Sequence, residues 1–367
     1  MPPEHVGILI NDSMYRGIPY RKTGTESLDN YEEAAKIFGL VPCFFRTQDL
    51  SPETGTAAGY IRDPSGYKRS MLPMPRVIHN RSFNRGSSDR QLISQLISQG
   101  IFVYNANTRY SKYHVHHMLY NDPLLQAALP DTTSANAASI RSMLRQHGDI
   151  ILKPCSGSIG RGIMRLRRGP FHDYLTYSRS APSSKGWRTL RISRSRIPAL
   201  VASRVRRSPY LVQQRIPLAT YKGSSYDIRI TIQRGLFGQW EISGMFAKTS
   251  SPRTFVSNIA QGGSAHSVHE VFYHSLPGIP PEVMAERTAE FAQRIANTLA
   301  VHMPYAADFG LDVAVTSDGR LYFIESNGRD QRYGFREAGM DEEWKETYRK
   351  PMAFARYLLN TGSWPVQ

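Results

Sequence analysis

Residues 310–328 read GLDVAVTSDGRLYFIESNG, and this stretch decides the fold. Its two apolar runs flank the tight-turn signal SDG at 317–319, so the stretch predicts an antiparallel hairpin. Asp312 lies in the first run, and Glu325 and Asn327 lie in the second. Because Glu325 and Asn327 are two residues apart, their side chains point to the same face of the strand.

The polar side chains of this hairpin predict a magnesium site. Two carboxylates and an amide oxygen that face one way are hard oxygen ligands, and Mg²⁺ commonly uses one or two carboxylates together with substrate phosphates. The alternative is an ordinary hairpin whose polar residues face solvent. Acidic residues inside the apolar runs GLDVAV and YFIESN favour the metal site. We therefore expect Asp312, Glu325 and Asn327 to bind Mg²⁺.

A loop of small residues follows Lys153. The strand-like residues 150–154 (IILKP) run into CSGSIGRG at 155–162, and a second strand-like stretch, GIMRLRR, follows. Small residues let backbone N–H groups approach an anion closely. No GK[ST] and no helix follow, so the loop is not a Walker A motif. A hairpin that folds over phosphates and a plain flexible hairpin both fit this pattern.

Basic residues accumulate between this loop and the acidic hairpin. Asp227 and Arg229 alternate within the strand-like residues 226–234, so both side chains point to one face. An arginine there can hold a phosphate or stabilise a developing charge. Each charge taken alone is typical of a solvated surface, but a succession before a carboxylate pair indicates an anion site. The polar residues that follow Arg229 in this succession are Lys248, Arg253 and Asn258.

The order of predicted elements divides the chain into three modules. Strand-like and helix-like stretches alternate over residues 1–108, which implies a small open parallel sheet. Later strand-like stretches follow one another with alternating polarity, which is typical of an antiparallel sheet. The clearest helical stretches are 28–39, 90–99, 282–300 and 341–361. The modules that we expect are 1–108, 109–208 and 209–367.

Positive charge is concentrated in one segment. The 367 residues carry a formal charge of +16, and residues 161–207 hold twelve arginines and Lys185 against one acid, Asp173. A basic block of this kind indicates an anionic partner, and a solvated basic insertion is the alternative. Few aromatic residues interleave with the arginines, so we do not expect a groove that stacks nucleic-acid bases.

Several classes of protein are not indicated. No apolar run approaches the roughly 20 residues that a membrane helix needs, and the N-terminus does not read as a secretory signal. Cys43 and Cys155 cannot form a disulfide framework, which favours a reducing, cytoplasmic setting. His114, His116 and His117 lack the spacing of a zinc site, and no GxSxG motif marks a hydrolase. Nothing in the sequence indicates an oligomeric state.

Taken in order, these motifs resemble the ATP-grasp superfamily over about residues 105–335. More narrowly, the chain is similar to the YheC/YheD family, the endospore coat-associated ATP-grasp proteins of spore-forming bacteria. GILIN, YEEAAKIFGLVPCFF, VIHNR and ILKP with SGSIGRGI carry this narrower likeness. The resemblance implies an α/β protein, α+β in the grasp core, with a Rossmann-like pre-grasp domain, a small subdomain and a large subdomain. It also implies ATP and Mg²⁺ as cofactors.

The resemblance further implies a role for each motif. Lys112 and Lys153 would contact the nucleotide phosphates. Arg229 and Lys248, together with Arg253, would steady the transferred γ-phosphate and the later tetrahedral intermediate. The same likeness implies that the metal is held by Asp312, Glu325 and Asn327. The remaining nucleotide contacts that it implies are Ser156, Gly157, Ser158, Gly160 and Gly162 over the phosphates, Gln213, Gln214 and Ile216 at the adenine, and Asn258.

Two positions depart from the superfamily pattern. Gln213 and Gln214 stand where many members have a glutamate that meets the adenine. After Asn327 the chain reads GRDQR instead of the proline-glycine turn of peptide ligases, and this puts the acceptor side in doubt. From their location alone, Arg329 or Arg332 could bind a substrate carboxylate.

These features predict an ATP-dependent carboxylate–amine ligase that forms an amide bond through an acyl phosphate and releases ADP and phosphate. Its expected partners are ATP, a carboxylate substrate such as an acidic peptide, and an amine acceptor, with no membrane and no nucleic acid. One alternative is a non-catalytic ATP-binding protein of spore-coat assembly. Another is a nucleic-acid binder that works through residues 161–207 and is indifferent to ATP.

Overall fold

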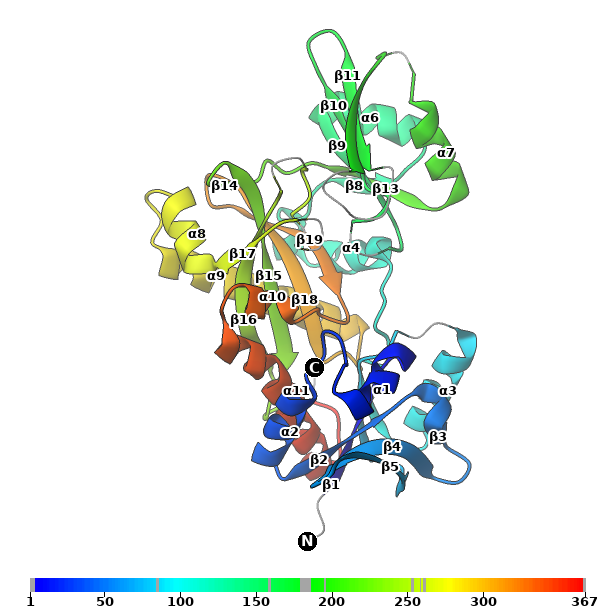
Figure 1. The fold of residues 1–367 in the computed structure, drawn as a ribbon. Helices are drawn as coiled ribbons and strands as arrows, with labels where there is room; N and C mark the ends of the chain where they lie inside the picture. Colours follow the sequence, from blue (N-terminus) through cyan, green and yellow to red (C-terminus); the bar gives the residue numbers. More distant parts are fainter. Residues whose placement is uncertain are drawn as a thin grey trace.

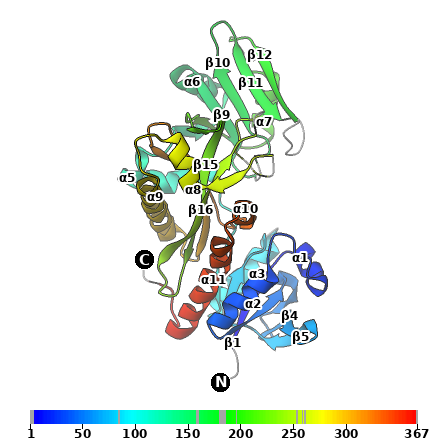
Figure 2. The same ribbon diagram turned by 60° about the vertical axis from the view of Figure 1, so that its left-hand side comes forward.

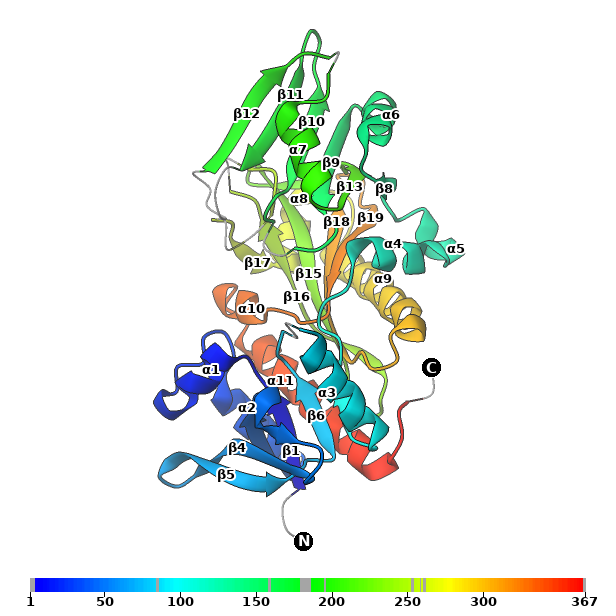
Figure 3. The same cartoon turned by 90° about the vertical axis from the view of Figure 1, so that its right-hand side faces the viewer.

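The computed structural model describes residues 4–83, 86–157, 160–178, 186–194, 196–251, 254–257, 259 and 262–365. Ser158, Arg253 and Asn258, which were predicted to contact the nucleotide or the transferred phosphate, lie outside these residues. Figure 1 shows three sheets stacked along the long axis of the molecule, and Figures 2 and 3 show the same order from two other sides. The three sheets and their helices agree with the α/β architecture expected from the sequence, with one sheet formed before the two that make up the expected grasp core.

The first sheet has the parallel core that was predicted for residues 1–108. Strands β1, β2, β6 and β7 pair in parallel, and β3, β4 and β5 add an antiparallel edge that was not predicted. In spatial order the strands are β3 (Leu50–Ser51), β4 (Thr56–Asp63), β2 (Leu40–Phe45), β1 (Glu4–Leu9), β6 (Val77–Asn80) and β7 (Phe102–Tyr104), with β5 (Gly66–Pro73) on β4. The helical segments of this part are α1 (Asp12–Gly17), η1 (Ile18–Tyr20), α2 (Leu28–Ile37), η2 (Thr47–Asp49) and α3 (Ser87–Ser98).

The last long helix, α11 (Asp341–Thr361), completes the core of this first sheet. Its Tyr348, Met352 and Leu358 share one buried cluster with Val6 and Ile8 of β1 and with residues of α2. Helix α3 covers the opposite face through another cluster. Helix α11 begins and ends where the sequence predicted, and it lies against a sheet that is more than two hundred residues earlier in the chain. The division of the chain at residues 108 and 208 stays a prediction.

A proline inside α11 links this helix to the third sheet. Pro351 has no N–H group, so the carbonyl of Thr347 lacks its usual helical donor. The side-chain amide of Gln233 donates to that carbonyl at 3.1 Å, and both residues are buried. The carbonyl left without a helical donor is therefore satisfied by a strand of the third sheet.

The second sheet is antiparallel and contains the predicted hairpin at residues 150–168. Helices α6 (Ala137–His147) and α7 (Ala199–Arg207) pack on one of its faces through Ile140, Met143 and Val201. The basic segment supplies three of the strands and α7. In spatial order the strands are β12 (Trp187–Ile192), β11 (Asp173–Ser178), β10 (Met164–Arg168), β9 (Asp149–Pro154), β13 (Tyr210–Gln214) and β8 (Thr132–Ser134).

The third sheet is also antiparallel and has one apolar face. Ile228, Ile230 and Ile232 of β15 point into the largest buried cluster, together with Phe309 and Leu311 of β18. The intervening residues of both strands therefore point to the opposite face. In spatial order the strands are β17 (Ala265–Ser267), β16 (Trp240–Thr249), β15 (Ser224–Arg234), β18 (Asp308–Val315) and β19 (Leu321–Asn327), with β14 (Thr220–Tyr221) on β15.

Helices cover the apolar face of this third sheet. The predicted helix at 282–300 is confirmed as α9 (Pro281–His302), whose Ile295 and Leu299 are fully buried in the same cluster. None of the described helices combines the length and the apolar character that a membrane crossing needs. The remaining helices of the grasp core are α4 (Lys112–Tyr120), α5 (Pro123–Gln126), α8 (Val268–Ser275) and α10 (Tyr333–Glu337).

Candidate active site

A cavity of about 340 Å³ lies between the second and third sheets. Its walls come from β9 and β13 on one side, from β15, β16, β18 and β19 on the other, and from residues near the first sheet. Thirteen of the predicted site residues line it: Lys112, Lys153, Ser156, Gly157, Gly160, Gln213, Gln214, Ile216, Arg229, Lys248, Asp312, Glu325 and Asn327.

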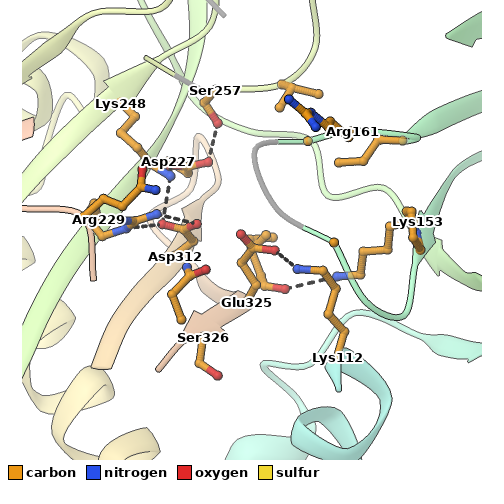
Figure 4. Close-up of a pocket in the computed structure, with 18 of the residues that line it drawn as sticks. Lys112, Lys153, Arg161, Asp227, Arg229, Lys248, Ser257, Asp312, Glu325 and Ser326 are labelled. Atoms are coloured by element: carbon orange, nitrogen blue, oxygen red, sulfur yellow. Dashed lines mark hydrogen bonds and ion pairs between the residues drawn. The ribbon is translucent and has the colours of Figure 1, made fainter. Parts of the chain in front are cut away.

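The acidic hairpin is confirmed as β18 and β19. Asp312 stands directly opposite Glu325, and Gly310 stands opposite Asn327. Residues two apart on a strand share a face, so all three polar side chains lie on the cavity side, as Figure 4 shows for Asp312 and Glu325. The Asn327 amide donates to the carbonyl of Gly310 at 3.3 Å.

Two cations hold the carboxylate of Asp312. The Arg229 guanidinium donates to both oxygens, at 2.6 and 3.1 Å, and the Lys248 ammonium donates at 2.8 Å. Arg229 faces Asp312 across the β15–β18 pair, so strand register brings them together. Burial alone would raise the pKa of Asp312, but the charges of Arg229 and Lys248 outweigh it and hold that pKa well below its usual range. The carboxylate is therefore ionised.

Asp227 adds a third carboxylate that was not among the predicted site residues. It faces Lys248 across the β15–β16 pair, with a 3.0 Å ion pair, and accepts a hydrogen bond from Ser257. Burial raises the pKa of Asp227 to about 6, with Lys248 opposing the shift and Asp312 adding to it. The alternation that marked Arg229 also marks Asp227, so the same signal could have identified it.

The two predicted phosphate-binding lysines approach the hairpin from the other side of the cavity. Lys112, the first residue of α4, forms an ion pair with Glu325, and Lys153 of β9 donates to the carbonyl of Ile324 at 3.1 Å. Figure 4 shows both ammonium groups beside the carboxylate of Glu325. Burial lowers the pKa of Lys153 to about 8, and the nearby charge of Lys112 adds to the shift.

The far end of the cavity is less polar. Ile151, Ile163, Ile216 and Leu218 line it, together with the two glutamines of β13. The side-chain amide of Gln213 donates to the Thr132 hydroxyl at 2.8 Å. The side-chain oxygen of Gln214 accepts from the backbone N–H of Asp131 at 3.3 Å. A planar heterocycle with hydrogen-bonding edges suits such an apolar slot.

Gly162 does not line the cavity, although it was predicted to contact phosphate. It adopts a φ of +77° and lies so close to Tyr210 and Pro154 that a Cβ atom would meet them at 2.9 and 3.1 Å. The Tyr210 hydroxyl donates to its carbonyl at 3.1 Å. Gly162 therefore serves the turn of the loop, whereas Ser156, Gly157 and Gly160 reach the cavity.

The expectation that Arg332 could bind a substrate carboxylate is wrong. Arg332 is 1% exposed and lies outside the cavity, where it pairs with Asp308 at 3.3 Å. Arg81 pairs with Asp308 at 3.3 Å and with Glu26 at 2.7 Å, and all of these side chains are buried. We refer to Glu26, Arg81, Asp308 and Arg332 as the sealed network. It joins the first sheet to the third.

The arginines of the basic segment divide into two groups. Arg165 lies on the cavity side of β10 and pairs with Asp149 at 2.6 Å. Beside it, the rings of Trp187 and Phe255 meet at 5.0 Å and connect the second sheet to the loop after β16. Among the residues of this segment that the structure describes, the exposed arginines apart from Arg161 at the cavity are Arg167, Arg168, Arg188, Arg191, Arg194, Arg196, Arg206 and Arg207.

The donor set of the hairpin fits magnesium. It offers two carboxylates and an amide on one cavity face, which are the hard oxygen ligands that Mg²⁺ uses together with phosphate oxygens. The described part of the chain contains no cluster of three or more His, Cys, Asp or Glu side chains that could hold a metal. Lys112, Lys153, Arg229 and Lys248 face the same space and are suited to polyphosphate oxygens.

Comparisons with known proteins identify a family and two relatives of this chain. A family model described as "YheC/D like ATP-grasp" matches residues 100–358. Endospore coat-associated protein YheD of Bacillus subtilis (strain 168) is 23% identical over 86% of this chain and 70% of its own length. Endospore coat-associated protein YheC of the same organism is 22% identical over 90% of this chain and 91% of its own length.

Solved structures share the fold at low sequence identity. The ATP-grasp ligase PsnB complexed with minimal precursor superposes with a TM-score of 0.56, at 13% identity, over 96% of this chain and 98% of its own. D-alanyl-alanine synthetase A from Vibrio cholerae superposes with a TM-score of 0.55, also at 13% identity, over 99% of each chain. These similarities concern the fold.

Proposed function

Because the chain belongs to the YheC/D like ATP-grasp family, we propose that it is an ATP-dependent carboxylate–amine ligase that forms an amide bond through an acyl phosphate. The observation that carries this proposal is the facing pair Asp312 and Glu325 in a cavity that also holds Lys112, Lys153 and Arg229. In this structure each carboxylate already has a cationic partner. Polyphosphate and metal could take over both halves of these ion pairs without leaving a buried charge unpaired.

The nucleotide would lie across the cavity. Its adenine suits the apolar end beside Ile151 and Ile216, and its phosphates suit Lys112 and Lys153. Ser156, Gly157 and Gly160 would cover the phosphates with backbone N–H groups. The loop is therefore the lid of the proposed site, and the β18–β19 hairpin is its floor.

Magnesium, when bound, would neutralise charge on the phosphates during transfer. Asp312, Glu325 and Asn327 are the residues that would hold it. Arg229 and Lys248 would remain beside Asp312 on the same face, where they can stabilise negative charge on the group in transfer.

The proposed reaction has two steps. A substrate carboxylate oxygen attacks the γ-phosphorus of ATP, the bond to ADP breaks, and an acyl phosphate forms. An amine then attacks the acyl carbon, phosphate leaves and the nitrogen loses a proton, which completes the amide. Arg229 lines the cavity with 13% of its side chain exposed, which supports the proposal that it would stabilise the oxyanion of the second step.

An acidic peptide is the substrate class that the charge distribution favours. The exposed arginines of the second sheet lie on the module that also carries Lys153 and the loop over the phosphates. A positively charged surface next to a cavity attracts anionic chains and raises their local concentration.

The names of the two curated relatives favour a second candidate function, in which the chain binds ATP as a non-catalytic component of spore-coat assembly. An enzyme and an assembly component differ in whether ATP is consumed. Both functions would need the cavity, so binding of ATP alone does not separate them.

The test is to incubate the protein with ATP, Mg²⁺ and candidate acidic peptides, including those encoded near its gene, and to measure ADP release and peptide mass. We expect ADP to appear only with an accepted carboxylate, and the peptide to gain the mass of the acceptor less water. A protein that binds ATP but releases no ADP with any carboxylate would favour the assembly function.

A further inference from the structure

The segment after Asn327 reads GRDQR, and its contacts explain three of its residues, Gly328, Asp330 and Arg332. A Cβ atom on Gly328 would meet the Tyr110 ring at 2.6 Å, so glycine is required where the two segments touch. Asp330 is fully buried and pairs with Arg229 at 2.8 Å. Arg332 belongs to the sealed network. Arg329 differs from Arg332 because it lines the cavity and because its one ion-pair partner in the part of the chain that the structure describes, Glu26, has a closer partner in Arg81.

Arg329 lies at the cavity wall with incomplete pairing. It is 9% exposed, lines the cavity, and lies over the ring of Phe83 at 4.3 Å. The carboxylate nearest to it in the described residues belongs to Glu26, at 3.7 Å, and Glu26 already pairs with Arg81 at 2.7 Å. Its Nε–H group has no acceptor among the residues whose placement is described. The arginine is buried with hydrogen-bonding capacity left over.

The charges around Arg329 do not balance. The guanidinium groups of Arg81, Arg329 and Arg332 converge on two carboxylates, Glu26 and Asp308. Arg81 and Arg332 are each 1% exposed, whereas Arg329 borders the cavity. The surplus positive charge of the cluster is therefore presented to the cavity.

Arg109 places a second guanidinium at the same ring. It lies over Phe83 at 4.8 Å, lines the cavity and is exposed. Within the described ranges no carboxylate forms an ion pair with it. Stacking on an aromatic ring fixes the plane of a guanidinium while its N–H groups stay available. Phe83 therefore holds two arginines at one end of the cavity.

We propose that Arg329, Phe83 and Arg109 form a subsite for a substrate carboxylate that is not itself activated. The inference rests on the proposed ligase function and adds that one of the two joined molecules carries this extra carboxylate. A planar carboxylate can accept two parallel hydrogen bonds from one guanidinium, and such a contact suits arginine better than lysine. The substrate carboxylate would also supply the hydrogen-bond acceptor that the Nε–H group of Arg329 lacks among the described residues.

The test uses the full chain saturated with ADP and Mg²⁺ and measures the dissociation constants of three small probes. Glutarate represents a donor with an extra carboxylate, β-alanine represents an acceptor with one, and butyrate carries only the carboxylate to be activated. We expect Arg329→Gln to weaken the binding of glutarate or of β-alanine about ten- to a hundredfold, as for a lost charge-assisted contact in a buried site. Butyrate should be unaffected. Glutarate sensitivity identifies the donor as the source, and β-alanine sensitivity identifies the acceptor.

Matched variants keep the test independent of folding. Arg336 is, like Arg109, an exposed arginine stacked on an aromatic ring, Trp344 at 4.7 Å. It lies outside the cavity lining, so Arg336→Gln should leave the affinity of every probe unchanged. If Arg329→Gln does not fold, Arg109→Gln removes the exposed member of the pair and should weaken the same probe about threefold or more. Arg329→Lys should recover only part of the affinity.

The outcomes separate this subsite from the ligase proposal. Normal ADP binding together with equal probe affinities in wild type, Arg329→Gln and Arg109→Gln would overturn the subsite and leave the proposed function standing. Absence of probe binding in a protein that binds ADP would overturn it as well. Loss of ADP and Mg²⁺ binding in the wild type would count against the proposed function itself.

Discussion

Strand β18 carries two buried carboxylates on one face, four residues apart, and their surroundings differ. Asp312 lines the cavity with Arg229 and Lys248, whereas Asp308 lies in the sealed network with Arg81 and Arg332. Both are nearly inaccessible, at 4% and 1% exposure. The distinction is that the first network borders a space that a ligand can enter, and the second is closed by the first sheet.

The comparison teaches that burial and ion pairing alone do not identify a functional site. A buried ion pair is costly to break because it leaves an uncompensated charge. In the sealed network no ligand can replace a lost partner, so its charges bear on folding and on the junction between modules. At the cavity, phosphate and metal can replace each partner in turn, so the same chemistry can serve binding. Five predictions test this distinction, beginning with the largest expected effect.

Breaking the sealed network should cause the largest loss of folding stability. Glu26→Gln leaves Arg81 and Arg332 with Asp308 as their one ion-pair partner among the described residues and removes the ion pair of Arg329, and we expect it to lower the free energy of unfolding by about 3–5 kcal/mol. Chemical denaturation would measure the loss. Glu53→Gln removes an exposed carboxylate of the same module and should change stability by less than about 0.5 kcal/mol. Equal effects of the two variants would contradict the comparison.

The effect of Glu26→Gln should also depend on pH. Burial would raise the pKa of Glu26, but Arg81, Arg332 and Arg329 outweigh it and lower that pKa to about 2. A carboxylate with a depressed pKa in the folded state contributes stability above its unfolded pKa and loses it as the pH falls through the folded value. The difference between wild type and Glu26→Gln should therefore shrink as the pH falls from about 4.5 toward about 2.

Changing the cavity network should affect activity more than stability. We expect Asp312→Asn to reduce ADP release about a hundredfold, roughly 2.7 kcal/mol, because one proposed metal ligand is lost. Its unfolding transition should shift less than that of Glu26→Gln, since water and ligand can reach the remaining partners. Asp318→Asn, in the turn of the same hairpin, is the matched control and should retain wild-type ADP release. A large loss of unfolding free energy in Asp312→Asn with unchanged ADP release would contradict the proposed role of Asp312 in binding.

The proposed role of Lys153 predicts a pH dependence of nucleotide affinity. Its pKa is lowered to about 8, so the ammonium is present at pH 7 and is lost as the pH rises through that value. A bound phosphate favours the charged form, so affinity should be constant below pH 8 and then weaken by up to about tenfold per pH unit. Fluorescent-nucleotide titrations from pH 7 to 9.5 would measure this. Lys153→Met should bind weakly at every pH and lose the dependence; an unchanged profile would remove Lys153 from the phosphate site.

The exposed arginines should give the smallest effects. Solvated charges on the rim of a site contribute up to about 1 kcal/mol and are screened by salt. We expect Arg167→Gln and Arg191→Gln each to weaken binding of an oligoglutamate peptide about two- to fivefold at low salt, with little difference in about 1 M salt. Arg90→Gln on α3, which removes an exposed charge from a different module, is the control. Equal peptide affinity in all three variants would discard the basic surface as a docking site for acidic chains.

Much of the fold could be predicted because local patterns determine it. Alternating polarity predicts the β18–β19 hairpin and its facing carboxylates, and the register confirms that pairing. Strand and helix alternation predicts the parallel core of the first sheet. Helical periodicity predicts α9 and α11. In each case the deciding signal lies within a short stretch of residues.

What could not be predicted depends on contacts between distant segments. Arg329 and Arg332 are three residues apart in the same loop, yet one lines the cavity and the other is sealed. Arg332 packs against Tyr348 of α11 and pairs with Asp308 of β18, whereas Arg329 lies over Phe83, and no pattern around residue 330 reports these distant contacts. The packing of Gly162 against Tyr210 likewise depends on how β13 pairs with β9, and its predicted contact with phosphate stays a prediction. The assigned roles of the cavity residues remain predictions.

The position of α11 has a consequence for how the chain matures on the ribosome. The first sheet ends near residue 104, but one of its faces is covered by residues 348–358. At roughly 5–20 residues per second, synthesis of the intervening chain takes on the order of 10–50 s. During that interval Val6, Ile8 and Phe44 lack their final cover, and the nascent sheet is open to chaperones. The module made first is thus among the last to be finished.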